Sequence, residues 1–250
     1  MSMKRLWSIG DIMPVITFAN TKGGAGKTTA VLLLATELAR SGHRVTVLDA
    51  DPQLWISRWH ELSGEIENLS VISHVTMASL EGHIRENRTN TDCFIIDLPG
   101  AKTPLLTMAL GISDHVLIPV QGSAMDARGA AEVLDHIEFL NRKMGKGIAH
   151  SIVLTRVNAM VATRSLLLVK MLLAEKNVSV LNTAIVERAA YRDIFDYGGT
   201  LLCLDKDKVS NIDKAVENAK AFAAEVAGLL PKRLLRLGTQ PARLFTRKAA

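Results

Sequence analysis

KGGAGKTT, residues 22–29, is a glycine-rich stretch between an apolar run at 15–19 and an apolar, helix-like segment at 30–38. It fits the phosphate-binding pattern G-x-x-x-x-G-K-[ST] in a shifted form, because the first glycine of that pattern would fall at Thr21. A strand, a glycine-rich loop and a helix in this order expose backbone N–H groups and a helix N-terminus to one ligand. The stretch therefore predicts a loop that binds a di- or triphosphate.

The residues of this loop have distinct expected roles. Lys27 would neutralise the β- and γ-phosphates, and the Thr28 hydroxyl would hold Mg²⁺. A second lysine, Lys22, precedes the glycines, and phosphate binding within one subunit leaves its role unexplained. The residues expected to contact the nucleotide are Gly23, Gly24, Ala25, Gly26, Lys27, Thr28 and Thr29.

Three aspartates follow two further apolar runs, at 44–48 and 94–96. Because ligands bind at the carboxyl edge of a parallel sheet, we expect Asp49, Asp51 and Asp97 to meet near the loop. Asp97 would hold Mg²⁺ through water, Asp51 would orient the attacking water, and Asp49 would support the metal shell. The alternative for each is an aspartate that caps a helix or turn at the end of a strand.

Apolar, β-branched runs alternate with longer helical segments along the chain. Strands are predicted at 15–19, 44–48, 69–72, 93–96, 115–120, 148–155 and 178–181. Helices are predicted at 28–40, 54–62, 77–87, 125–143, 162–175, 187–196 and 209–230. This alternation indicates an α/β fold of the P-loop NTPase type, a single domain with a twisted, mainly parallel sheet and helices on both faces.

The composition is that of an ordinary globular protein, with 48% hydrophobic and 22% charged residues. The chain has no 18-residue apolar run without charges and no secretory signal at its N-terminus, so we expect a cytoplasmic protein without a spanning helix. The net charge is +5, and residues 231–250 carry six basic side chains and no acidic one. This basic arm indicates a polyanionic partner.

Two pairs of residues are expected to have structural roles. Trp55 and Trp59 lie four residues apart on one predicted helix, and we expect both to pack inside. Cys93 and Cys203 each have apolar neighbours, and we expect buried free thiols.

Three motifs together resemble the ParA/MinD family of deviant Walker ATPases: the lysine-first KGGAGKTT, DADPQ at 49–53 and IIDLPG at 95–100. The segment at 180–198 looks like the late segment of the small plasmid-partition proteins of the ParF type, and the segment at 119–130 is similar to the family's Pro-to-Asp loop. On this resemblance we divide the chain into a lead-in at 1–14, an ATPase domain at 15–230 and a basic tail at 231–250. The lead-in is too short for the helix-turn-helix extension of the larger ParA proteins.

The resemblance implies a homodimer in which two subunits enclose two ATP molecules. Lys22 matches the family lysine that reaches the phosphates of the other subunit, and Asp51 matches the water-activating aspartate. Lys27, Thr28 and Asp97 match the phosphate and Mg²⁺ ligands. The expected cofactors are ATP and Mg²⁺, and the expected reaction is slow ATP hydrolysis to ADP and phosphate.

The implied function is DNA segregation on the nucleoid. The ATP-bound dimer would bind DNA without sequence preference, and a small centromere-binding or adaptor protein would stimulate hydrolysis. The candidate DNA contacts are Arg188, Arg192, Lys214, Lys220, Lys232, Arg233 and Arg236. Such contacts carry affinity without base readout and weaken with salt. For Arg188 and Arg192 the alternative is a surface or nucleotide-side contact, and for the tail it is a solvated end.

Other members of the superfamily provide rival interpretations. Apolar and basic residues at 230–237 could form a MinD-like membrane helix, but Gly238 and Pro241 limit it to about two turns, and we do not expect a membrane partner. A ParA-like protein could instead position a non-DNA cargo or serve conjugal transfer, as a virulence-type relative does. An iron–sulfur reductase needs cysteines after the 94–96 strand, where this chain has none nearby.

Overall fold

Seven parallel strands form the centre of the structure, in the spatial order β3-β2-β4-β1-β5-β6-β7. The computed structural model describes residues 13–122, 124–145, 147–158 and 178–230. The strands are β1 (Val15–Phe18), β2 (Val45–Asp49), β3 (Leu69–Ile72), β4 (Cys93–Asp97), β5 (His115–Val120), β6 (Ala149–Val157) and β7 (Ile185–Val186). The predicted α/β fold with a parallel sheet is confirmed.

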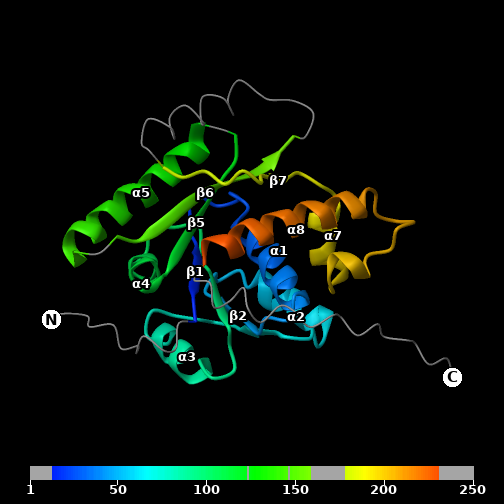
Figure 1. The fold of residues 1–250 in the computed structure, drawn as a ribbon, viewed down its shortest axis with the longest axis horizontal. Helices are drawn as coiled ribbons and strands as arrows, with labels where there is room; N and C mark the ends of the chain where they lie inside the picture. The colour runs from blue at the N-terminus through cyan, green and yellow to red at the C-terminus, as the bar shows by residue number, and fades with distance from the viewer. Residues whose placement is uncertain (1–12, 123, 146, 159–177, 231–250) are drawn as a thin grey trace.

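Helices connect these strands and cover both faces of the sheet. They are α1 (Lys27–Arg40), α2 (Trp55–Ser63), α3 (Leu80–Asn87), α4 (Pro104–Ile112), α5 (Ala124–Met144), α7 (Ala190–Tyr197), the 3₁₀ turn η1 (Leu201–Cys203) and α8 (Ile212–Leu229). Figure 1 shows α4 and α5 on one side of the sheet and α1, α7 and α8 on the other. Among the described residues, no helix is long and apolar enough to span a membrane.

Each face of the sheet has its own apolar core because successive strand residues point to opposite faces. In β4, Cys93 and Ile95 join the core under α1, α2, α7 and α8. Phe94 and Ile96 join the core under α3, α4 and α5. A strand buried on both faces explains the continuous apolar runs in the sequence.

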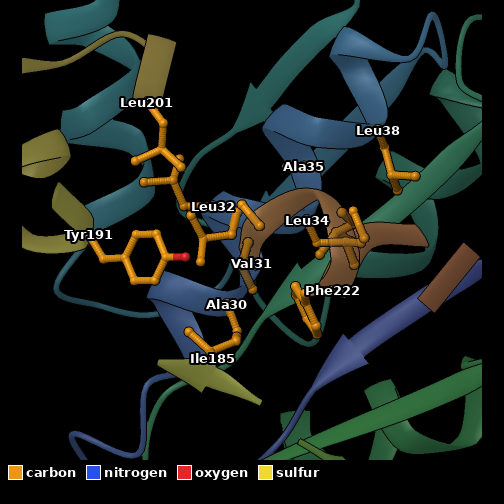
Figure 2. Close-up of a cluster of buried hydrophobic side chains, with 14 of the residues drawn as sticks. Ala30, Val31, Leu32, Leu34, Ala35, Leu38, Ile185, Tyr191, Leu201 and Phe222 are labelled. Carbon is orange, nitrogen blue, oxygen red and sulfur yellow. The ribbon is translucent and has the colours of Figure 1, made fainter. Parts of the chain in front are cut away.

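Helix α1, which follows the glycine-rich loop, lies at the centre of the first core. Figure 2 shows Leu32 and Leu34 of α1 among side chains of α7, α8 and η1, with Tyr191 and Phe222 close by. The Tyr191 hydroxyl donates a hydrogen bond to the Ala215 carbonyl at 2.9 Å. Because the side chains of α1 are closely packed in this core, the helix holds the loop rigidly at its N-terminus.

The second half of the chain differs from the prediction. A strand was expected at 178–181, but only Val180 forms a bridge, to Ile152, and the seventh strand is at Ile185–Val186. The reason lies between them, because the backbone N–H groups of Asn182 and Thr183 donate to the Glu225 carboxylate at 2.7 Å. This contact turns the chain before the strand begins. The helix predicted at 162–175 lies outside the described residues.

Helix α4 was not predicted, although its start signal is present. The Thr103 hydroxyl accepts a hydrogen bond from the Leu106 N–H, and Pro104 occupies the first helical turn. Both features favour a helix start. The segment that follows is so uniformly apolar that it has no polar stripe to mark its period.

Two packing expectations are partly wrong. Trp59 is buried as expected, but Trp55 is 47% exposed. Helix α2 has one buried stripe, and Trp55 begins the helix outside it. Both cysteines are free, but Cys203 is exposed in the short η1 turn while Cys93 is buried in β4.

Candidate functional site

The glycine-rich loop connects central strand β1 to helix α1. Strand β1 lies between β4 and β5, so the connections on its two sides leave in different directions, which is where open α/β sheets bind ligands. Gly26 caps α1 with φ of +89°, a left-handed conformation that favours glycine. The loop therefore presents the N-terminus of α1 at the carboxyl edge of the sheet, as the sequence predicts.

Side chains from β6, from just after β5 and from the start of α1 hold the loop in place. The Thr155 hydroxyl on β6 donates to the Ala25 carbonyl at 2.8 Å. The side-chain amide of Gln121, after β5, donates to the Gly24 carbonyl. The Lys27 ammonium donates to the Lys22 carbonyl at 3.3 Å. These contacts fix the loop carbonyls on the protein side and leave the cavity side to a ligand.

The turn after β4 packs directly against the loop. A Cβ at Gly100 would lie 2.6 Å from the Gly23 nitrogen, so only glycine permits this approach of two backbones. The IIDLPG motif therefore serves a second purpose besides its aspartate, because it brings the end of β4 to the phosphate loop.

The loop lines a cavity of about 630 Å³. This volume lies within the usual range for small-molecule sites, roughly 300–1,000 Å³. The predicted site residues on its wall are Gly23, Gly24, Gly26, Lys27, Thr28, Thr29 and Asp51. The wall is completed by residues of α2, the Gly100 turn, the end of β6 and α7. Predicted residues of two motifs thus share one cavity, and the third motif contributes Pro99 and Gly100 to its wall while Asp97 does not line it.

Lys27 is a buried cation on this wall. The residue is only 5% exposed. Burial lowers the pKa of its ammonium group from the ordinary value, and the negative charges of Asp97 and Asp51 oppose this shift. A buried cation beside helix N–H groups favours an anionic ligand.

Asp97 is the other buried charge of the site. Neither of its carboxylate oxygens has a hydrogen-bond partner among the described residues. Burial raises its pKa to about 7, and the nearby charge of Asp49 adds to this, whereas the Thr28 hydroxyl and the Lys27 charge lower it. A buried, unpartnered carboxylate beside a hydroxyl fits a hard cation.

These residues fit Mg²⁺ that arrives with a nucleotide. Among the described residues there is no cluster of three or more histidine, cysteine or carboxylate side chains that could hold a metal by itself. Mg²⁺ commonly binds through one or two carboxylates, waters and substrate phosphates. Asp97 and Thr28 would supply the protein side of such a site.

Asp49 has a different environment. It is fully buried, and its Oδ2 accepts hydrogen bonds from the Ser57 hydroxyl at 2.7 Å and the Ser57 N–H at 3.0 Å. Burial raises its pKa, and these hydrogen bonds oppose the shift. Asp49 does not line the cavity, whereas Asp51 does. The structure thus separates two aspartates that are two residues apart in sequence.

The remaining predicted residues lie around this centre. Lys22 is half-buried at the start of the loop, and its backbone N–H donates to Asn20 Oδ1 at 2.8 Å. Ala25 is buried behind the loop and does not line the cavity. Both residues therefore support the loop backbone, and the role of the Lys22 side chain remains a hypothesis.

Four of the candidate DNA contacts lie within the described residues, in and just before α7 and on α8. Arg192 lines the cavity and pairs with Glu187 at 3.5 Å, which agrees with the alternative of a nucleotide-side contact. Arg188 has a buried Nε without a hydrogen-bond partner among the described residues. Lys214 and Lys220 are exposed on α8, where Lys214 pairs with Glu217 at 3.1 Å. Lys232, Arg233 and Arg236 lie outside the described residues.

Several cavity residues were not found from the sequence. They are Gln53, Trp55, Arg156, Tyr191 and Phe195. Arg156 follows Thr155 at a register shift between β6 and β7, and its φ of +50° is left-handed. Its position after a predicted strand was the available signal, because strand ends meet at this edge. The α7 residues had no such signal.

Comparisons with known proteins agree with this geometry. The CobQ/CobB/MinD/ParA nucleotide-binding domain matches residues 16–202. Protein ParA of Rhizobium radiobacter is 36% identical over 214 residues, which cover 86% of this chain and 96% of that protein. The maintenance of carboxysome distribution protein A of Halothiobacillus neapolitanus is 28% identical over 181 residues, covering 71% and 82%. Among solved structures, apo McdA of Cyanothece has a TM-score of 0.68 at 19% identity, covering 84% and 99%, which indicates a shared fold.

Proposed function

Because the chain belongs to the CobQ/CobB/MinD/ParA nucleotide-binding family, we propose that it is a Mg²⁺-dependent ATPase that segregates DNA. The observation that carries the proposal is the arrangement of Lys27, Thr28 and Asp51 on one cavity wall, with the unpartnered Asp97 buried behind it. This set matches the requirements of nucleotide hydrolysis: a phosphate cradle, a cation site and a carboxylate for water.

The chain's own residues divide the work. The loop N–H groups and Lys27 bind the phosphates of ATP, and Thr28 and Asp97 hold Mg²⁺. Bound Mg²⁺ would neutralise phosphate charge and orient the phosphate oxygens. Asp51 orients the water that attacks the γ-phosphate, and ADP and inorganic phosphate leave. Asp49 is a further candidate for the metal shell on sequence grounds, although its Oδ2 accepts both hydrogen bonds from Ser57 and its Oδ1 accepts one from the Asp51 N–H.

We propose that two copies of the chain enclose two ATP molecules, with Lys22 reaching the phosphates held by the other copy. The position of Lys22 at the start of the loop, ahead of the cavity-lining glycines, supports this role. Substitution of Lys22 should then impair dimer closure or hydrolysis more than nucleotide binding by the monomer.

The ATP-bound dimer would bind DNA through Arg188, Lys214, Lys220 and the basic tail, which includes Lys232, Arg233 and Arg236. The six basic residues of the tail and the absence of acidic ones there support a phosphate contact. Affinity should therefore fall steeply between low and moderate salt. A complex that is insensitive to salt would contradict this contact. An adaptor protein would stimulate hydrolysis and release the DNA.

Asp51→Ala provides the test of the proposed function. The variant should bind ATP, fail to turn it over and remain on DNA, because the phosphate cradle is intact while the attacking water is no longer oriented. ATP turnover, ATP affinity by calorimetry and DNA retention are measured side by side, with Asp193→Ala, an α7 residue outside the cavity wall, as control. Normal turnover in Asp51→Ala would remove Asp51 from the mechanism.

A second cargo is favoured by one observation, the similarity to the carboxysome distribution protein. A ParA-like ATPase could position a protein compartment by the same cycle. The trapped Asp51→Ala protein distinguishes the two cargoes, because proteins that copurify with it identify the adaptor. A DNA-binding adaptor favours partition, and a compartment protein favours the second cargo.

A further inference from the structure

The connection between β2 and α2 is closed by a buried hydrogen-bonded pair. Asp49, the last residue of β2, is fully buried, and Ser57 in the first turns of α2 is 6% exposed. The Asp49 carboxylate accepts from both the N–H and the hydroxyl of Ser57. This pair fixes where α2 begins relative to the sheet.

Asp51 lies within the segment that this pair closes. Its backbone N–H donates to Asp49 Oδ1 at 3.3 Å, and its own Oδ1 accepts from the Gln53 N–H at 2.9 Å. Leu54 then adopts a left-handed φ of +53°, which is unfavourable for a residue with a Cβ. Strained backbone of this kind persists only where its surroundings hold it. Asp49 precedes Leu54 in sequence and Ser57 follows it, and the hydrogen bonds between these two residues hold the segment that contains Leu54.

Asp49 and Asp97 differ in how many hydrogen bonds their carboxylates accept, and this difference distinguishes a structural residue from a metal ligand. Both oxygens of Asp49 accept hydrogen bonds from the protein, whereas neither oxygen of Asp97 does so among the described residues. Asp49 Oδ2 is occupied by the two Ser57 contacts, so a metal at Asp49 would have to bind Oδ1 and compete with the Asp51 N–H that it accepts at 3.3 Å. A metal at Asp97 would displace no hydrogen bond of ordinary geometry with the described residues and would lie beside the Thr28 hydroxyl, which acts on the same carboxylate.

We infer that Asp49 and Ser57 are positioning residues that hold Asp51 at the nucleotide cavity, and that Asp49 is not a Mg²⁺ ligand. The inference rests on the proposed function, because it assumes that Asp51 orients the attacking water. It names Ser57, which lies outside the sequence motifs, as a residue that sets the rate of hydrolysis.

The test compares Ser57→Ala, Asp49→Asn and the double variant. Each single variant should lower kcat about 10- to 100-fold, since small displacements of a reacting group have effects of this order. KM for ATP and the Mg²⁺ concentration that gives half-maximal nucleotide binding should remain at wild-type values. The double variant should be no slower than the slower single variant, because both residues act through the same hydrogen-bonded pair.

Ser63→Ala is the matched control on the same helix. The Ser63 hydroxyl donates to the Trp59 carbonyl and accepts from the Gly199 N–H, at the end of α2 away from Asp51. This variant should lose stability in urea unfolding yet keep its kcat. Ser57→Thr retains the hydroxyl and should keep most of the wild-type kcat, which a purely steric role of the site would not allow.

The outcomes separate this inference from the proposed function. Wild-type kcat in a folded Ser57→Ala protein would overturn it. A raised Mg²⁺ requirement in Asp49→Asn, with none in Ser57→Ala, would return Asp49 to the metal shell. If the wild-type protein binds ATP and Mg²⁺ but has no turnover, the proposed ATPase function fails, and the Mg²⁺ titrations still decide whether Asp49 is a ligand.

Discussion

Gly26→Ala should destabilise the protein through two separate effects, a backbone conformation that is unfavourable for alanine and a close contact with Thr155. Gly26 has φ of +89°, and a Cβ there would lie 3.2 Å from Thr155 Cβ and Oγ1. The left-handed conformation costs alanine about 1–2 kcal/mol. The contact with Thr155 adds to this, because Thr155 is buried in β6 and its hydrogen bond to Ala25, worth about 1 kcal/mol, must shift. We expect a total loss of about 2–4 kcal/mol.

Gly42 offers a control with the same backbone and no neighbour. Its φ is also +89°, and a Cβ there would meet nothing within 4 Å. Gly42→Ala should therefore show the conformational cost alone, about 1–2 kcal/mol, and leave ATP binding unchanged. Urea unfolding gives the stabilities, and calorimetry with Mg²⁺ and a non-hydrolysable ATP analogue gives the affinities.

Nucleotide affinity is the decisive measurement. A displacement of the loop that costs 1.4 kcal/mol of binding energy lowers affinity about tenfold, and Gly26→Ala should lose at least this much. Adding Thr155→Ser, which removes the methyl group and keeps the hydroxyl, should restore part of both losses. Equal stability losses at Gly26 and Gly42, together with wild-type affinity in Gly26→Ala, would refute the assignment of Thr155 as a support of the loop.

Three further predictions follow from single contacts. Lys27→Ala should abolish ATP binding in calorimetry, because the phosphates lose their buried cation, and an unchanged affinity would overturn its assignment. Trp59→Phe should lower the free energy of unfolding in urea by about 1–2 kcal/mol, because the indole donates to the Gly199 carbonyl at 3.0 Å in a buried site. Trp55 is exposed, so Trp55→Phe should lower it by less than about 0.5 kcal/mol. Equal losses in the two variants would contradict this prediction. His115 has its pKa lowered to about 4 by burial and by nearby His150, so its contribution to stability is complete above about pH 6.5 and is lost as the pH falls from there towards 4. Wild-type protein should therefore lose about 1–2 kcal/mol more than His115→Gln between pH 7 and 5, and parallel unfolding curves across this range would exclude the effect.

The sequence was most informative where structure is local. The loop at 22–29, the strands before and after it and the aspartates at strand ends follow from short-range order and from the geometry of a parallel sheet. The seventh strand could not be placed, because Glu225, more than forty residues away, decides where the chain turns. The roles of Gln121 and Thr155 could not be predicted for the same reason, since they act on loop carbonyls 97 and 130 residues away in sequence.

Asp49 and Asp51 show the limit of a motif most clearly. In sequence both are aspartates that follow the apolar run at 44–48, and the same reasoning assigns both to the metal and water. The difference arises from Ser57, whose hydroxyl and N–H take up one carboxylate and leave the other to the cavity. Which way a side chain points after a strand depends on the helix that follows, and no spacing rule in the motif contains that information.

The two buried charges of the site explain why it should accept metal and nucleotide together. Lys27 and Asp97 lie close enough to shift each other's pKa, yet no ion pair within 4.0 Å joins them in the described part of the chain. Buried charges that are not paired are costly, and a ligand that brings charge of both signs would lower the cost at both groups. A triphosphate with bound Mg²⁺ would offer an anion to Lys27 and a cation to Asp97. We therefore expect the site to bind the complex more tightly than either part alone.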